Sequence, residues 1–223
     1  MTIEELAQIA GANGLTLNDT QQVQLATYAE LLREKNQLVN LISRKDEENI
    51  LDKHILHSLT IAMPQVTGFA LPPGATVFDI GTGGGLPGIP LSIARTDLST
   101  VICDSIVKKI TAANEFIIKL GLSNCKAVIG RTEELANKPE HRSHYDFIVS
   151  RAVAPLDELL TWSRRLMKNG ATLLSLKGGD LGDEIARIKK MHGVKEVDER
   201  LLTLENYPGF AGDEKKVVRV LMQ

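Results

Sequence analysis

A glycine-rich loop between an apolar strand and a helix is the part of this chain best suited to bind a ligand. Residues 76–90 read TVFDIGTGGGLPGIP, so an apolar run that ends at Asp79-Ile80 leads directly into Gly81 and Gly83. Glycine reaches positive φ freely and has no Cβ, so its backbone can approach a nucleotide closely. Asp104 ends the next apolar run about 20 residues later, where a carboxylate accepts hydrogen bonds from ribose hydroxyls. The sequence therefore predicts a nucleotide-containing ligand at this loop.

Two cofactor classes fit the spacing of the glycines. The pattern GxGxxG at Gly83, Gly85 and Gly88 is the dinucleotide fingerprint, which would favour an NAD(P)-dependent oxidoreductase. The pattern D-x-G-x-G-x-G starts at Asp79, includes Gly81 and follows the strand end more closely. It resembles motif I of the class I S-adenosylmethionine (SAM) methyltransferases. We favour SAM, while the dinucleotide interpretation stays open at this point.

Alternating strands and helices must position these residues. We expect strands near 76–80, 101–104, 126–129, 145–150 and 171–176, with helices near 87–95, 108–120, 155–167 and 181–192. Such alternation predicts an α/β fold with a doubly wound parallel sheet. Ligands bind beyond the carboxyl ends of the strands in this architecture. Five residues at these ends are expected to lie around one crevice: Asp79, Gly81, Asp104, Arg151 and Lys177.

The two ends of the chain complete the predicted fold. Three helices are expected in the first 70 residues: one from a capping box at 2–5, one capped by residues 18–20, and one over 46–62. A linker is expected at 68–74, so the chain is predicted to comprise a helical N-terminal cap (1–70) and an α/β domain (71–223). Two closing strands are expected at 201–204 and 217–222, joined by a polar turn.

Composition and charge describe a globular protein without a targeting segment. The chain has 223 residues, of which 43% are hydrophobic, and its net charge of −2 argues against a general polyanion binder. No apolar run approaches the roughly 18 residues of a membrane span, and the acidic N-terminus lacks the pattern of a signal peptide. We therefore expect a cytoplasmic protein. Cys103 and Cys125 lack metal-ligand spacing, so we expect buried thiols, no metal and a monomer.

The segment after the fourth predicted strand bears on the methyl acceptor. Methylation of an exocyclic amine usually comes with an Asp/Asn-Pro-Pro-aromatic motif there, and methylation at carbon 5 of a pyrimidine needs a cysteine there. This chain has neither and reads SRAVAP at 150–155. The ring nitrogen N7 of a purine carries a free lone pair and needs no base to remove a proton. The absence of both motifs is therefore what an N7 acceptor would predict.

Seven segments extend the comparison with methyltransferases over nearly the whole chain. They are NLIS at 40–43, HILHSL at 54–59, DIGTGGGLPGIPL at 79–91, CDS with a lysine pair at 103–109, GRTEEL at 130–135, SRAVAPL at 150–156 and LKGG at 176–179. Their combination resembles the bacterial 16S ribosomal RNA (guanine-N7) methyltransferase G family, also called the glucose-inhibited division protein B family.

This resemblance implies a Rossmann-like SAM-dependent methyltransferase that methylates N7 of guanine 527 in 16S rRNA, either in naked RNA or in the 30S particle. The cofactor-binding residues that we expect are Gly81, Leu86, Thr132, Glu133 and Arg151, together with Gly83 and Asp104 from the loop pattern. No catalytic residue is assigned. A SAM-binding module without catalytic activity is an alternative that the sequence leaves open.

The sequence leaves the roles of four side chains open. Arg151 could contact the SAM carboxylate or the target guanine, and we favour a positioning role. Lys177 could bind an RNA phosphate or the target base, or be a solvated lysine at a strand end. His54 and His57 would share a helix face, as metal ligands could, but no third ligand is in view, so we favour packing or hydrogen bonding.

Overall fold

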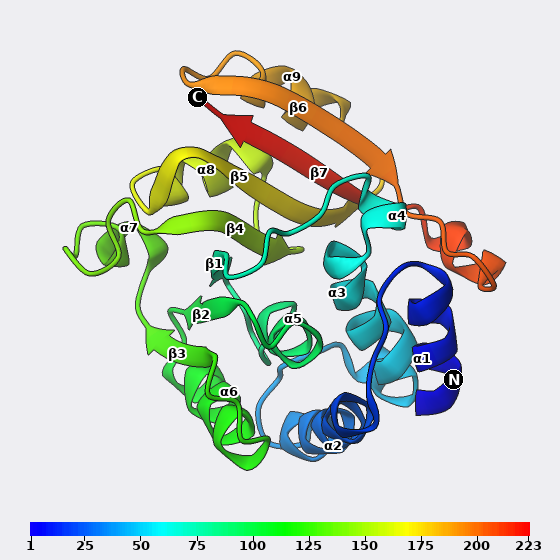
Figure 1. Ribbon diagram of the computed structural model, residues 1–223. Coiled ribbons are helices and arrows are strands. Elements are labelled where there is room, and N and C mark those ends of the chain that lie inside the picture. Colours follow the sequence, from blue (N-terminus) through cyan, green and yellow to red (C-terminus); the bar gives the residue numbers. More distant parts are fainter.

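A seven-stranded twisted sheet forms the centre of the molecule (Figure 1). The computed structural model describes residues 1–223, except for the side chains of residues 211 and 213. The strands are β1 (Thr76–Ile80), β2 (Ser99–Asp104), β3 (Cys125–Ile129), β4 (Tyr145–Arg151), β5 (Met167–Gly178), β6 (Val194–Leu201) and β7 (Lys215–Met222). Their order is β3-β2-β1-β4-β5-β7-β6, and β7 runs antiparallel to both neighbours. The predicted α/β fold is therefore confirmed.

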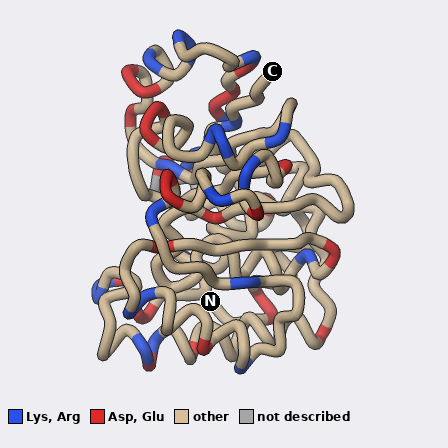
Figure 2. Tube along the Cα trace, turned by 90° about the vertical axis from the view of Figure 1, so that its left-hand side faces the viewer, with Lys and Arg blue, Asp and Glu red and all other residues tan. Residues whose placement is uncertain are grey.

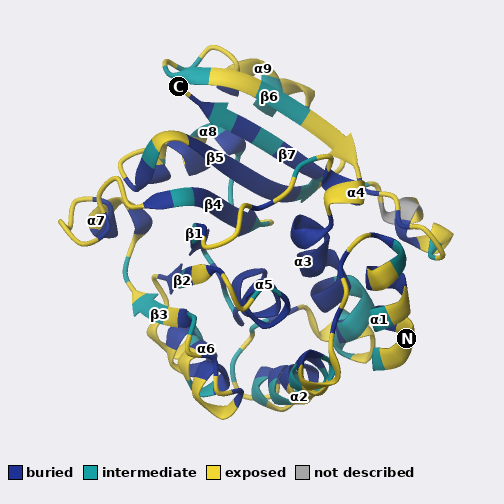
Figure 3. Cartoon of the chain, in the orientation of Figure 1, coloured by how far each residue is buried: buried dark blue, intermediate teal, exposed yellow. Residues whose placement is uncertain are grey.

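Helices cover both faces of the sheet, which explains the continuous apolar runs of the central strands. The helices of the α/β part are α5 (Gly88–Ala94), α6 (Val107–Lys119), α7 (Thr132–Leu135), α8 (Leu156–Ser163) and α9 (Gly182–Ile188). One face packs against α5 and α6, and the other against α7, α8 and α9. Figure 3 shows that the strands in the middle of the sheet are buried almost throughout, whereas β6 is largely exposed.

The N-terminal region begins with two capped helices, as the sequence predicts. Helix α1 (Ile3–Ala12) has a capping box between Thr2 and Glu5, and α2 (Asp19–Asn36) has one between Asn18 and Gln21. A single helix over 46–62 is not formed, so that prediction is wrong. The chain instead passes through η1 (Arg44–Asn49), the π-helical η2 (Ile50–Leu56), α3 (His57–Leu59) and η3 (Thr60–Ala62), before α4 (Pro64–Thr67).

Hydrogen bonds from side chains account for part of this interrupted segment. The Ser58 hydroxyl donates to the carbonyl of His54 at 2.7 Å, and the Thr60 hydroxyl donates to that of His57 at 2.6 Å. Hydroxyls that donate to carbonyls of the preceding turn compete with the regular helical hydrogen bonds. The backbone then changes its hydrogen-bond spacing, which gives short stretches of 3₁₀ and π helix.

The N-terminal helices share a hydrophobic core with one face of the sheet. Buried side chains of α1, α2 and α3 belong to the same cluster as those of α5, α6 and β1. Polar contacts cross the same boundary, since Gln21 Nε2 donates to the carbonyls of Ile93 (2.9 Å) and Ala94 (3.0 Å), and Gln24 donates to that of Leu120 (2.8 Å). The N-terminal region therefore braces the face of the sheet that carries α5.

Tyr28 is the strongest link between this brace and the glycine-rich loop. Its ring is fully buried and packs edge-on against Phe116, and its hydroxyl donates to the carbonyl of Gly84 at 2.9 Å. Tyr28→Phe should lower the free energy of unfolding by about 1–2 kcal/mol, because the Gly84 carbonyl loses its donor. Weaker SAM binding should accompany this loss. Urea unfolding and calorimetric titration measure both quantities, and wild-type values in both would contradict the bracing role.

The second corrected element is the first of the two closing strands. It lies at Val194–Leu201 and not at 201–204, although one further hydrogen bond joins the Leu202 amide to the Lys215 carbonyl at 2.8 Å. Charged residues and exposed positions dominate this edge strand, so its sequence lacks the apolar alternation that predicts a strand. The second closing strand is confirmed as β7, and η4 (Pro208–Asp213) lies between the two. None of the described helices has both the length and the hydropathy of a bilayer-spanning segment.

Candidate functional site

A cavity of about 340 Å³ opens at the carboxyl ends of β1, β2, β3 and β4. It is lined by Ile80, Gly81, Cys103, Asp104, Ser105, Lys109, Gly130, Arg131, Thr132, Glu133, Ala152, Val153 and Trp162. Four of the seven residues predicted to bind the cofactor therefore line one cavity, namely Gly81, Asp104, Thr132 and Glu133. The position agrees with the rule that ligands of doubly wound sheets bind beyond the carboxyl ends of the strands.

The glycine-rich loop wraps around the end of β1 in a conformation that needs glycine. Gly81, Gly83 and Gly85 have φ values of 64°, 57° and 102°, which side chains rarely tolerate. A Cβ on Gly81 would also lie only 2.8 Å from Cγ1 of Val153, which lines the same cavity. The Leu86 amide donates to the Thr82 carbonyl at 2.9 Å and closes the turn. Leu86 is buried and does not line the cavity.

Asp79 holds this loop through hydrogen bonds from within the protein interior. Its side chain is completely buried, and Oδ2 accepts hydrogen bonds from the Thr82 hydroxyl (2.5 Å) and the Gly88 amide (2.9 Å), on opposite sides of the loop. Burial raises the pKa of the Asp79 carboxyl to about 7, although both hydrogen bonds and the charge of Arg151 oppose the shift. Asp79 therefore supports the loop, and it is absent from the lining of the cavity.

This raised pKa predicts a specific dependence of stability on pH. An unfolded aspartate titrates near 4, so between pH 4 and pH 7 the folded chain holds more protons at Asp79 than the unfolded chain does. The contribution of Asp79 to stability therefore falls as pH rises through this window, by up to about 1.4 kcal/mol per pH unit. Asp79→Asn should remove that slope. Unfolding curves of both proteins from pH 4 to pH 7 measure it, and parallel pH profiles would contradict the assignment.

Asp104 connects the glycine-rich loop to the start of α6. Its Oδ2 accepts from the Gly83 amide at 3.1 Å, and its Oδ1 accepts from the Ile106 amide at 2.9 Å. Only 8% of the residue is exposed, yet it lines the cavity. Each carboxylate oxygen can accept more than one hydrogen bond, so Asp104 can bind ribose hydroxyls while it holds both amides. Gly83 does not line the cavity but contributes through this bond.

The start of α7 forms another side of the cavity. Thr132 is buried, with its hydroxyl 3.6 Å from the Cys103 sulfur, while Glu133 is exposed to solvent at the rim. Burial raises the pKa of the thiols of Cys103 and Cys125 to about 12, so both are protonated near neutral pH. Both cysteines are buried and free, as predicted.

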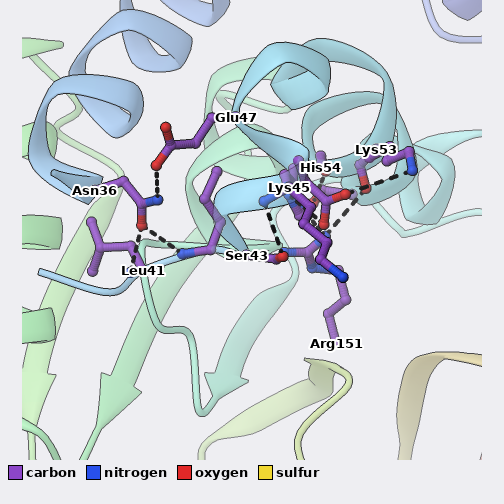
Figure 4. Close-up of polar contacts among 11 residues, drawn as sticks. Asn36, Leu41, Ser43, Lys45, Glu47, Lys53, His54 and Arg151 are labelled. Carbon is purple, nitrogen blue, oxygen red and sulfur yellow. Dashed lines mark hydrogen bonds and ion pairs between the residues drawn. The ribbon is translucent and has the colours of Figure 1, made fainter.

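Arg151, the last residue of β4, does not line this cavity. Its guanidinium lies 2.7 Å from His54 Nδ1 and donates to the Lys53 carbonyl at 3.4 Å (Figure 4). Burial and the adjacent Arg151 charge lower the pKa of His54 to about 4, so the imidazole is neutral and accepts the hydrogen bond. Asp46 faces the other imidazole nitrogen at 3.7 Å. Residues of the N-terminal region therefore fix the direction of the Arg151 side chain.

Asn36 shapes the neighbouring segment and was missed by sequence analysis. Its buried side-chain oxygen accepts from the amides of Leu41 (2.8 Å) and Ile42 (2.9 Å), while its nitrogen donates to Glu47 at 2.6 Å (Figure 4). The resulting turn places Leu41 against the glycine-rich loop, since a Cβ on Gly84 would lie 3.2 Å from Leu41 Cβ. An asparagine at a helix end gives no sequence signal for a contact of this kind.

Ala152, Val153 and Trp162 line the cavity and were not among the predicted cofactor-binding residues. Ala152 and Val153 lie in the loop after β4, and Trp162, the single tryptophan of the chain, lies on α8. An isolated tryptophan on an amphipathic helix indicates core packing, so only the tertiary structure reveals this position. Trp162 also provides an intrinsic fluorescence signal at the cavity.

Charges of both signs are distributed over the chain. Figure 2 shows Lys and Arg interspersed with Asp and Glu, without one continuous basic region in that view. Lys109 and Arg131 are the two basic residues that line the cavity. Such a distribution agrees with the small net charge and with a few local contacts to a polyanion.

Comparison with known proteins agrees with this architecture. The model of the family described as rRNA small subunit methyltransferase G (GidB) matches residues 21–206. Ribosomal RNA small subunit methyltransferase G of Chlorobaculum tepidum is 41% identical over 198 residues, which cover 89% of this chain and 82% of that relative. The protein of the same description from Salinibacter ruber is 40% identical over 215 residues, with coverages of 92% and 94%.

Solved structures support the same fold. A SAM-dependent methyltransferase of Aquifex aeolicus has a TM-score of 0.51 at 21% identity and covers 70% of this chain and 86% of its own. A precorrin-6y C5,15-methyltransferase of Geobacter metallireducens has a TM-score of 0.51 at 12% identity, with coverages of 82% and 91%. At these identities the likeness concerns the fold alone, and the predicted methyltransferase fold is confirmed. From the extent of the family match and the identity to its relatives, this chain belongs to the rRNA small subunit methyltransferase G family.

Proposed function

We propose that this protein transfers a methyl group from SAM to N7 of a guanine, position 527, in 16S ribosomal RNA. The observation that supports this most directly is the cavity beside the glycine-rich loop, found in a chain of the rRNA small subunit methyltransferase G family. The substrate follows from the names of the relatives, and the N7 acceptor follows from the resemblance in sequence.

The residues around the cavity fit SAM. Because Gly81 has no Cβ, Val153 packs directly against the glycine-rich loop, and the two residues together shape this part of the cavity. Asp104 has acceptor capacity for the ribose hydroxyls, and Thr132 with Glu133 would hold the adenine end. Leu86 and Gly83 would act by keeping the loop in shape.

The proposed chemistry is a direct displacement. When bound, SAM would supply an electrophilic methyl group, and the N7 lone pair would accept it as the carbon–sulfur bond breaks, so the positive charge of the sulfur would pass to the purine and no proton would be removed. The protein therefore needs to align the reactants and to exclude water. The cysteine thiols are protonated and Asp79 is buried beneath the loop, which agrees with a site that uses no nucleophile or general base of its own.

Arg151 is the residue that we propose to position the target base. The side chain is directed by His54 and Lys53 to a place outside the cofactor cavity, and its N–H groups can donate to the guanine O6 while N7 stays free to attack. His54 is neutral and positions the guanidinium without adding charge. The alternative, contact with the SAM carboxylate, is tested below by comparing SAM affinity with turnover.

The substrate that we propose is 16S rRNA, and the form in which it binds is open to direct test. Titration calorimetry with SAM and with NADH identifies the cofactor, and transfer of labelled methyl to naked 16S rRNA and to 30S particles compares the two substrates. We expect SAM binding and transfer to RNA by a monomer. SAM binding without transfer to either substrate would indicate a binding module, and NADH binding in place of SAM would overturn the proposal.

A further inference from the structure

We infer that the ion pair between Lys177 and Glu184 is a latch that positions the loop after β4, residues 152–155, against the cofactor cavity. This inference rests on the proposed SAM site and concerns residues that do not line it. The sequence leaves Lys177 open as an RNA contact or a solvated lysine, whereas the structure directs its charge inward.

The latch consists of three hydrogen bonds that join Lys177 and Glu184 to each other and to the backbone around Pro155. Lys177 Nζ, at the end of β5, donates to the Ala154 carbonyl at 2.6 Å and to Glu184 Oε2 at 2.7 Å. The same Glu184 oxygen accepts from the Leu156 amide at 2.9 Å. The pair therefore fixes the backbone on both sides of Pro155, where the loop enters α8.

Both side chains of the pair are largely withdrawn from solvent. The Lys177 side chain is 9% exposed and that of Glu184 is 22% exposed. Removing one partner from a pair that is largely withdrawn from water leaves the other charge without compensation, so both partners are needed together. Binding of an RNA phosphate by Lys177 would require this pair to open.

The loop that the latch holds forms one wall of the cofactor cavity. Ala152 and Val153 line the cavity, and Val153 packs against Gly81 of the glycine-rich loop. Ala152 has a φ of 53°, a conformation that a residue with a side chain keeps only when its surroundings enforce it. Its amide donates to the Leu176 carbonyl at 3.2 Å, next to Lys177. We therefore assign Lys177 and Glu184 as positioning residues for the cavity wall.

The test compares Lys177→Met, Glu184→Ala and the double variant with wild type. Each single variant should weaken SAM binding about tenfold, about 1.4 kcal/mol, and the double variant should be no weaker than either single one, because both changes remove the same latch. The KM for RNA should be unchanged. Glu184→Gln keeps an acceptor for the Leu156 amide and should recover part of the affinity, and it serves as the second variant if Glu184→Ala does not fold.

Lys168→Met is the matched control. Lys168 also pairs with a carboxylate, that of Asp146 at 2.9 Å. It lies near the start of β5, at the other end of the strand from Lys177, and it does not line the cavity, so its loss should leave SAM affinity unchanged. The inference is overturned if Glu184→Ala binds SAM like wild type, or if Lys177→Met raises only the KM for RNA. Failure of wild type itself to bind SAM would refute the proposed function instead, so the two failures are distinguishable.

Discussion

Gly81→Val should abolish measurable SAM binding, with a loss of at least about 100-fold in affinity, or about 2.7 kcal/mol. Gly81 has a φ of 64°, and a Cβ there would lie 2.8 Å and 2.9 Å from the two γ-carbons of Val153. A branched side chain would therefore either fill the space for the cofactor or push the loop after β4 away from it. Calorimetric titration measures the affinity, and quenching of Trp162 fluorescence gives an independent signal at the same cavity.

Gly121→Val is a closely matched control for this substitution. Gly121 follows α6 with a φ of 65°, and no atom lies within 4 Å of a Cβ built there. Both variants therefore carry the same backbone strain, roughly 1–3 kcal/mol, and only one of them obstructs the cavity. Gly121→Val should lose stability and keep its SAM affinity. A folded Gly81→Val protein that binds SAM like wild type would show that the cofactor site is elsewhere.

Arg151→Met should reduce turnover on 16S rRNA by roughly 10- to 100-fold, because a hydrogen bond from a charged donor contributes about 1.5–3 kcal/mol. The guanidinium is held by His54 and the Lys53 carbonyl outside the cofactor cavity, so SAM affinity should change little. Arg151→Lys retains the charge but loses the planar fork, and its turnover should fall between those of wild type and Arg151→Met. Single-turnover methyl transfer together with SAM titration separates the two quantities.

Arg142→Met controls for the general loss of a positive charge, since Arg142 is exposed and lies between α7 and β4. Its turnover should remain close to that of wild type. If Arg151→Met instead loses SAM affinity in proportion to turnover, Arg151 contacts the cofactor and not the base.

Local sequence patterns were sufficient to predict the part of the fold that carries the glycine-rich loop. An apolar strand that ends at Asp79-Ile80, glycines at positions of positive φ, and Asp104 at the end of the next strand are local features, and each is found where it was predicted. The buried middle of the sheet reads as apolar runs for the same reason, because both of its faces are covered by helices.

Features that depend on contacts between distant segments could not be predicted. The edge strand β6 has charged residues because it faces solvent, so its pattern does not differ from that of a loop. Arg151 and His54 lie 97 positions apart in the sequence. Lys177 and Glu184 are only seven apart, but the Ala154 carbonyl that completes their arrangement is brought to them by the packing of α8 and α9. Only the packed structure distinguishes such a lysine from a solvated one.

The central claim is methyl transfer to N7 of one guanine in 16S rRNA, and the most direct test maps the modified base. 16S rRNA from cells that lack this protein is incubated with the purified protein and SAM, and 7-methylguanosine is located by chemical cleavage of the strand at the methylated base. Our account predicts a single new cleavage at the guanine at position 527, absent in reactions with Gly81→Val. Methylation of another atom or another base would contradict it, as would unmodified RNA from a protein that binds SAM.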